Sequence, residues 1–222
     1  MFRGFDTYGF PGTTNMDWLA ANTNLKWTGL YLSHAPGKPD LGWINAYSKI
    51  AKTWGIAPIY VGRQAPATGE LDDRSTKAAS IDAEETIQLA REAAIPLGKV
   101  IYLDIETGGL QPANAMAYIT GWIDATRHGG YTAGVYCSYL TLNQLLAARP
   151  GIVAWVWRLT IDSHTILGPD FDTDEGAPAA PYTGARMQQY AQNCSVDLMA
   201  GQSLQIDASV STVADPSIAP SN

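Results

Sequence analysis

Short runs of β-branched and aromatic residues recur along the chain, and their number and spacing predict eight strands. Several runs, such as VIYLDIE and TAGVYCS, are apolar at nearly every position. This pattern is typical of parallel strands that are covered on both faces. The predicted strands span residues 3–8, 27–33, 57–62, 100–106, 132–138, 153–159, 186–191 and 205–210.

Helical periodicity separates the early strands and stops after the sixth one. Helices are predicted at residues 16–21, 43–54, 75–94, 113–128 and 142–148. The next connection, residues 160–185, contains several helix breakers, among them Pro169, Gly176 and Pro178. This order of elements predicts an α/β TIM-like barrel whose last three strands lack full helical cover. An open, doubly wound sheet is the alternative.

The predicted elements form a single domain over residues 1–210, and 222 residues are enough for one self-sufficient core. Residues 211–222 are expected to form a frayed tail or the stub of a linker. No apolar run reaches the ~18 to 20 residues of a membrane span, and no signal-peptide pattern follows Met1. We therefore expect a phage product, in a virion or as a lysin, or a domain excised from a larger exported protein.

Charge and cysteine content exclude two classes of function. The formal net charge of −7 opposes attraction to phosphate backbones, so nucleic acid is not an expected partner. Two cysteines, Cys137 and Cys194, are too few for a disulfide framework or a four-ligand zinc site. They allow one disulfide, but two buried thiols are the favoured interpretation.

Acidic residues lie at or near the ends of three predicted strands. Asp104 and Glu106 are two residues apart, so the strand period places both on one face. Mutual repulsion and partial burial would raise the proton affinity of one of them, which provides an acid beside a base for glycosidic bond cleavage. Asp6 and Asp207 occupy comparable places in the first and last strands. Each of these two alone is more simply a capping carboxylate, but four converging acids favour catalysis.

The segments GFDTYGFPG, PIYVGRQ, YLDIE, GVYCS, QQY and QID resemble the glycoside-hydrolase-like domain of unknown function 1906, related to family 25 glycoside hydrolases, the Chalaropsis-type lysozymes. The resemblance extends from Gly4 to about Val210. It implies a (β/α)5β3 barrel and cleavage of β-1,4 bonds in bacterial cell-wall peptidoglycan. It also implies that Glu106 is the general acid, that Asp104 orients the substrate acetamido group or stabilises the developing cation, and that Asp6 and Asp207 support them.

A catalytically weak or inactive module that binds cell-wall glycan, as part of a phage or surface assembly, is the alternative function. A purely structural domain is a third. Aromatic and amide side chains at or near strand ends would bind sugar in either of the first two cases. Residue parity favours Tyr8 and Tyr102 in particular, and the full set is Tyr8, Tyr60, Gln64, Tyr102, Tyr136, Trp157, Gln189 and Tyr190.

Other motifs do not support a metal or a cofactor. Residues 170–176 resemble a calcium loop, but the glycine is one place late and Pro181 stands where a bidentate glutamate is needed. His34, His128 and His164 lack metal-ligand spacing, although His34 follows the second strand and could face the cavity. Neither a nucleophile elbow nor a phosphate-binding glycine loop is present. We expect no metal site and no organic cofactor.

Overall fold

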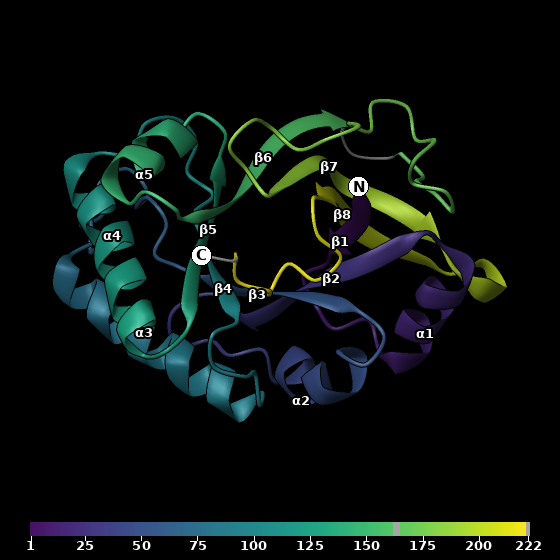
Figure 1. The fold of residues 1–222 in the computed structure, drawn as a ribbon, viewed down its shortest axis with the longest axis horizontal. Helices are drawn as coiled ribbons and strands as arrows, with labels where there is room; N and C mark the ends of the chain where they lie inside the picture. Colours follow the sequence, from purple (N-terminus) through teal and green to yellow (C-terminus); the bar gives the residue numbers. More distant parts are fainter. Residues whose placement is uncertain (162–164, 221–222) are drawn as a thin grey trace.

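The computed structural model describes residues 1–161 and 165–220, and its strands close into one barrel in chain order (Figure 1). The strands are β1 (Phe2–Asp6), β2 (Leu25–Ser33), β3 (Gly55–Val61), β4 (Val100–Asp104), β5 (Thr132–Ser138), β6 (Val153–Ile161), β7 (Met187–Asp197) and β8 (Ser203–Ser211). The helices are α1 (Thr13–Asn22), α2 (Leu41–Ile50), α3 (Thr76–Glu92), α4 (Ala113–His128) and α5 (Leu142–Ala148), and a short 3₁₀ turn, Met199–Gly201, joins the last two strands. The predicted barrel is confirmed, and the open sheet is wrong.

Alternation along the strands builds two apolar layers. Inward side chains such as Trp27, Ile59, Tyr102 and Trp155 fill the barrel interior. Outward side chains pack under the helices in a larger cluster. Two helix starts are fixed by side-chain caps, because Asp40 and Ser75 accept hydrogen bonds from backbone N–H groups of α2 and α3.

A loop replaces helices over the last strands. No α-helix follows β6 among the described residues, as the proline and glycine content predicts. Leu167 and Phe171 from this loop are buried in the outer apolar cluster instead. Asn24 and Arg3 attach the loop, since Asn24 accepts from the Phe171 N–H and Arg3 pairs with Asp172 at 2.7 Å. Figure 1 shows helices around one side of the barrel and this loop beside β6 and β7.

Several strand ends and one strand direction differ from the prediction; β7, for example, continues six residues beyond its predicted end at residue 191, to Asp197. β1 ends at Asp6 and β4 ends at Asp104, so Tyr8 and Glu106 lie on the loops that follow. β8 runs antiparallel to both β7 and β1, whereas the other neighbours are parallel. The prediction that Asp207 lies near the carboxyl end of its strand is therefore wrong: it is in the middle of β8, where it pairs with Asp6.

The segment after β8 closes the opposite, amino end of the barrel, so the expectation of a frayed tail or linker stub is wrong for the described part of it. Figure 1 shows this segment, in yellow, crossing the barrel opening. Pro216 accepts a hydrogen bond from the Tyr102 hydroxyl at 2.8 Å, and Ser217 accepts one from the Val100 N–H at 2.7 Å. Asp215 pairs with Lys99 and accepts from the Ile56 N–H.

The two cysteines are buried thiols, as favoured from the sequence. They lie on β5 and β7. Burial, with a smaller contribution from the Asp104 charge, raises the pKa of Cys137 to about 12. Within the described residues, no helix combines the length and the apolarity that crossing a membrane requires.

Candidate active site

Four carboxylates gather at the carboxyl end of β1 and β4, around three adjoining cavities. A small lobe of about 230 Å³ lies beside β1, β2 and β8, and a large lobe of about 500 Å³ lies beside β5, β6 and β7. Between them, a floor of about 40 Å³ extends into the barrel. Glu106 and Asp207 line all three cavities, so the three form one cleft; Asp6 lines the small lobe and the floor, and Asp104 lines the floor.

Asp6 and Asp104 are the buried acids of this cleft, with 6% and 3% of their surface exposed. Within the described residues, Asp6 Oδ2 and Asp104 Oδ1 have no hydrogen-bond partner. Burial, together with the nearby charges of Asp207 and Glu106, raises the pKa of Asp6 well above its usual value, although the Tyr31 hydroxyl lowers it. Burial and the charges of Glu106 and Asp6 likewise raise the pKa of Asp104. Unsatisfied buried carboxylate oxygens are costly, which marks this floor as a site for a ligand.

Asp207 is half-buried and better satisfied. Its oxygens accept from Gln189 Nε2 at 2.8 Å and from the Asn193 N–H at 2.7 Å. These hydrogen bonds lower its pKa, but burial and the Glu106 charge dominate and raise it. Gln189 also accepts from the Tyr136 hydroxyl, so one amide connects β5, β7 and β8 at the cleft.

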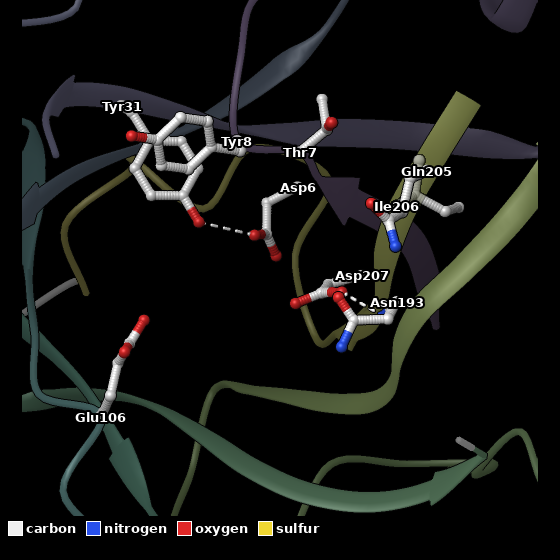
Figure 2. A pocket seen from close by; sticks show the side chains of 9 residues that line it. All are labelled: Asp6, Thr7, Tyr8, Tyr31, Glu106, Asn193, Gln205, Ile206 and Asp207. Carbon is white, nitrogen blue, oxygen red and sulfur yellow. Dashed lines mark hydrogen bonds between the residues drawn. The ribbon is translucent and has the colours of Figure 1, made fainter. Parts of the chain in front are cut away.

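Glu106 approaches from the other side. Figure 2 shows its side chain across the cavity from Asp6 and Asp207. It is exposed, on the loop after β4, and its backbone N–H donates to Gln64 Oε1 at 2.9 Å. An exposed carboxyl group at the mouth, opposite buried ones at the floor, can reach a bond that lies across the cleft.

Sequence reasoning missed Tyr31, whose hydroxyl donates to Asp6 Oδ1 at 2.8 Å (Figure 2). The signal was available, because Tyr31 follows Trp27 and Gly29 on the inward face of β2. His34 lies beside the cleft rather than in its lining, and it stacks on Tyr8 with ring centroids 3.9 Å apart. Tyr8 itself is 74% exposed and forms part of the small lobe.

The large lobe contains three of the predicted sugar-binding residues: Tyr136, Trp157 and Gln189. Gln192 and Asn193 also line it, and neither was a candidate from the sequence. An indole, a phenol and several amides are the groups that stack on and hydrogen-bond to sugars.

Three predicted tyrosines are not at the cleft. Tyr60 and Tyr190 are fully buried on the outward face, where Tyr60 donates to Glu85 of α3 at 2.7 Å and Tyr190 lies 5.6 Å from the Arg3 guanidinium. Tyr102 does point inward, but it occupies a deeper layer and donates to the C-terminal segment. Residue parity gives the face of a strand and not the depth along the barrel, so it could not exclude Tyr102.

The described chain shows no cluster of side chains suited to a metal ion. No group of three or more His, Cys, Asp or Glu side chains that could hold a metal ion occurs among residues 1–161 and 165–220. Two acids of the calcium-like segment bind protein groups outside it: Asp172 pairs with Arg3, and Asp174 accepts from the Gly168 N–H. His164 lies outside the described residues.

Comparison with known proteins points to one family. The model of the Rv2525c-like, glycoside hydrolase-like domain matches residues 18–210. No curated protein matches the chain.

Three solved structures share the fold. The Tat-secreted protein Rv2525c of Mycobacterium tuberculosis has a TM-score of 0.64 at 13% identity, with 98% of each chain covered. The bacterial lysozyme of Streptomyces coelicolor has a TM-score of 0.61 at 14% identity, covering 96% of this chain and 92% of the lysozyme. The modular autolysin LytC of Streptococcus pneumoniae, in complex with a synthetic peptidoglycan ligand, has a TM-score of 0.56 at 16% identity, covering 94% of this chain and 46% of LytC.

Proposed function

The chain belongs to the family of Rv2525c-like, glycoside hydrolase-like domains, and from this premise we propose that it cleaves β-1,4 glycosidic bonds in bacterial cell-wall peptidoglycan. Its fold is shared with a lysozyme and with an autolysin that binds a peptidoglycan ligand, which supports a cell-wall glycan as the substrate. The reaction is hydrolysis by carboxylate acid catalysis.

The observation that carries the proposal is the opposition of Glu106 to three acids with raised pKa values across one cleft. Glycoside hydrolysis needs one carboxyl group that protonates the leaving oxygen and a second that acts at the anomeric side. Glu106 is exposed at the mouth and is the group free to approach a glycosidic oxygen, so we assign it as the general acid. Asp104 is buried at the floor and is assigned the second role.

The shape and lining of the floor favour substrate-assisted cleavage. About 40 Å³ suffices for a group of a few heavy atoms, and Ile59 and Trp155 line it beside Asp104 and Tyr136. An acetamido group fits this chemistry, because its methyl group would contact the apolar side chains and its N–H would donate to the Asp104 carboxylate. In that position its carbonyl oxygen would attack the anomeric carbon while Glu106 protonates the leaving oxygen, and configuration would be retained.

The test is hydrolysis of purified peptidoglycan, followed by loss of turbidity and by release of reducing ends. Glu106→Gln keeps the shape of the side chain but cannot donate the proton, so we expect a loss of at least about 100-fold in rate with glycan binding retained. Glu84→Gln, an exposed change on α3, is the matched control and should leave the rate unchanged. Glycan strands with a free amine in place of the acetamido group should be cut far more slowly even where they bind.

Three results would contradict different parts of the proposal. Hydrolysis that survives Glu106→Gln would assign the acid elsewhere. Wild-type protein that binds glycan strands in a pulldown but releases no reducing ends would favour the alternative, a glycan-binding module. A product with inverted anomeric configuration, detected by NMR, would show that the nucleophile is a water molecule activated by Asp104 or Asp6 and not the acetamido group.

A further inference from the structure

We propose that Gln64 is a positioning residue whose side chain holds the backbone of Glu106 in place. This inference rests on Glu106 being the acid of the proposed function. The sequence suggested sugar binding for Gln64, but Gln64 does not line any of the three cavities of the cleft. Its amide instead joins the loop after β3 to the loop that carries Glu106.

Glu106 needs such support because the sheet no longer provides it. β4 ends at Asp104, and the Ile105 N–H donates to the Tyr136 carbonyl of β5 at 2.9 Å. Beyond that bond Glu106 is exposed, and no side chain among the described residues is hydrogen-bonded to its carboxylate. The bond from its own N–H to Gln64 Oε1 therefore holds the Glu106 backbone directly. The next residue, Thr107, is held by the Ala65 N–H, which donates to its hydroxyl, and by Gln111 Nε2, which donates to its carbonyl.

The hydrogen-bonding groups of the Gln64 amide are almost all occupied by backbone partners. Its Nε2 donates to the Asp104 carbonyl at 3.0 Å and to the Gly62 carbonyl at 3.1 Å, which accounts for both of its N–H groups. Its Oε1 accepts from Glu106 at 2.9 Å. One side chain thus contacts the backbone of both acids of the Asp-x-Glu pair and leaves no donor for a sugar hydroxyl.

Gln64 is anchored from the opposite side by its neighbour Arg63. The Arg63 guanidinium binds the fully buried Asp82 of α3 through two bonds, at 2.8 and 3.1 Å. The backbone N–H of Arg63 donates to the Tyr118 hydroxyl at 3.1 Å. Tyr118 in turn donates to Asp82 at 2.8 Å. A paired, hydrogen-bonded ion pair of this kind is rigid, so the loop is fixed to the helical layer.

The same loop lies too close to β4 to move inward. The Gly62 N–H donates to the Asp104 carbonyl at 3.2 Å, and a Cβ at Gly62 would lie 2.6 Å from Leu103 Cδ1. Gly62 therefore permits the close approach that lets Gln64 reach across β4. The connected path runs from Asp82 through Arg63 and Gln64 to Glu106, and it ties the position of the acid to helix α3.

The experiment compares Gln64→Met with Gln144→Met. Gln144 on α5 makes the same pair of bonds, with Oε1 accepting from the Gln111 N–H and Nε2 donating to the Gln111 carbonyl, at the far end of the same loop. A displacement of about 1 Å at a reacting group costs on the order of 100-fold in rate. We expect Gln64→Met to lower kcat by about 10- to 100-fold with KM changed less than about threefold. Gln144→Met should leave both unchanged.

Gln64→Glu adds a pH signature that a purely structural role would not produce. Protonated, this side chain still donates and accepts; ionised, it cannot donate to Asp104 and Gly62. Its activity relative to wild type should rise as the pH falls from 7 to 4, whereas the ratio for Gln64→Met should stay flat. Thermal melts of each variant at each pH exclude unfolding as the cause.

Amide hydrogen exchange gives a readout that does not need hydrolysis. The Glu106 N–H should exchange at least about 10-fold faster in Gln64→Met than in wild type and stay protected in Gln144→Met. Unchanged exchange, a kcat within twofold of wild type, or an equal loss in Gln144→Met would overturn the positioning role. Failure of the proposed function is distinct, because it shows as hydrolysis that is absent in wild type or that persists in Glu106→Gln.

Discussion

At the scale of single residues, burial of the Asp104 carboxyl group at the floor of the cleft lowers the stability of the folded protein. Asp104 keeps a buried oxygen without a protein partner, and burial with the charges of Glu106 and Asp6 raises its pKa. A raised pKa in the folded state means that folding takes up a proton above the pKa of the unfolded aspartate. The contribution of Asp104 to stability is therefore present at low pH and is lost as the pH rises through the folded value. Such destabilisation is common where a site is built for a ligand.

We accordingly expect Asp104→Asn to unfold at a higher temperature than wild type at pH 7, because the amide cannot ionise. The difference should shrink as the pH falls towards the usual aspartate pKa, because the unfolded-state carboxyl then also becomes protonated. Calorimetric melts from pH 4 to 8 measure this, and hydrolysis assays on the same samples should show activity strongly reduced. A variant less stable than wild type at every pH would contradict the argument.

The hydroxyl of Tyr31 supports Asp6 from β2. Tyr31→Phe removes the bond to Asp6 Oδ1, so we expect about 1 to 3 kcal/mol lower free energy of unfolding and a further rise in the pKa of Asp6. Hydrolysis should fall with it. Tyr190→Phe is the matched control, since the Tyr190 hydroxyl is buried without a partner in the described chain and its removal should be neutral or stabilising. Urea denaturation measures the free energy of unfolding of both variants. Equal losses in Tyr31→Phe and Tyr190→Phe would show that the hydrogen bond from Tyr31 to Asp6 does not stabilise the fold.

At the scale of elements, the runs of β-branched and aromatic residues predicted the strands well and their ends less well. The bounds of α4, β5 and α5 agree with the expectation: Pro112 and Gly129 directly flank α4, Gly130 lies two residues before β5, and Pro150 lies two residues after α5. β4 reads as a strand to Glu106 because Ile105 is as apolar as the residues before it, and Ile105 is indeed buried. What ends pairing there is the geometry of the neighbouring strands, which the local sequence does not contain.

The inward face of β2 needs a glycine at position 29, because a side chain there would collide with neighbouring strands. Gly29 on β2 lies against Asp6, and a Cβ there would be 2.5 Å from Asp6 Cβ and 2.9 Å from Ile59 Cδ1. We expect Gly29→Ala to cost about 1 to 3 kcal/mol of stability and to reduce hydrolysis by displacing Asp6. Gly9→Ala, with no atom within 4 Å of the added Cβ, is the control. Circular dichroism melts and rates measured in parallel would refute this if both variants behaved alike.

At the scale of the whole molecule, the meeting of the four acids at one end of the barrel was predictable from the sequence. The position of Asp207 within its strand was not. Asp6, Asp104 and Glu106 follow from strand order and parallel pairing. Asp207 was placed by the wrong argument, because β8 is antiparallel and Asp207 reaches the cleft from mid-strand. The direction of a last strand depends on its connection, and the short link between β7 and β8 is typical of a hairpin.

The segment after β8 is a structural part of the barrel. Deletion of residues 213–222 would leave the Tyr102 hydroxyl and the Val100 and Ile56 N–H groups without their partners. At about 1 to 3 kcal/mol for each buried group, we expect about 3 kcal/mol or more lost from the free energy of unfolding. Urea titration measures this, and the intact chain carrying Ser203→Ala at the exposed start of β8 is the control. A truncated chain as stable as wild type would show that the segment only covers the surface.

The antiparallel course of β8 also determines how the cleft is oriented relative to the two ends of the chain. Phe2 pairs with Ser211, so both ends of the barrel chain leave from the amino end, while the acids open at the other end. A polypeptide fused to either terminus would extend away from the cleft and would not cross its mouth. A domain with this polarity can be anchored from behind and still present its open side to a surface as broad as a cell wall.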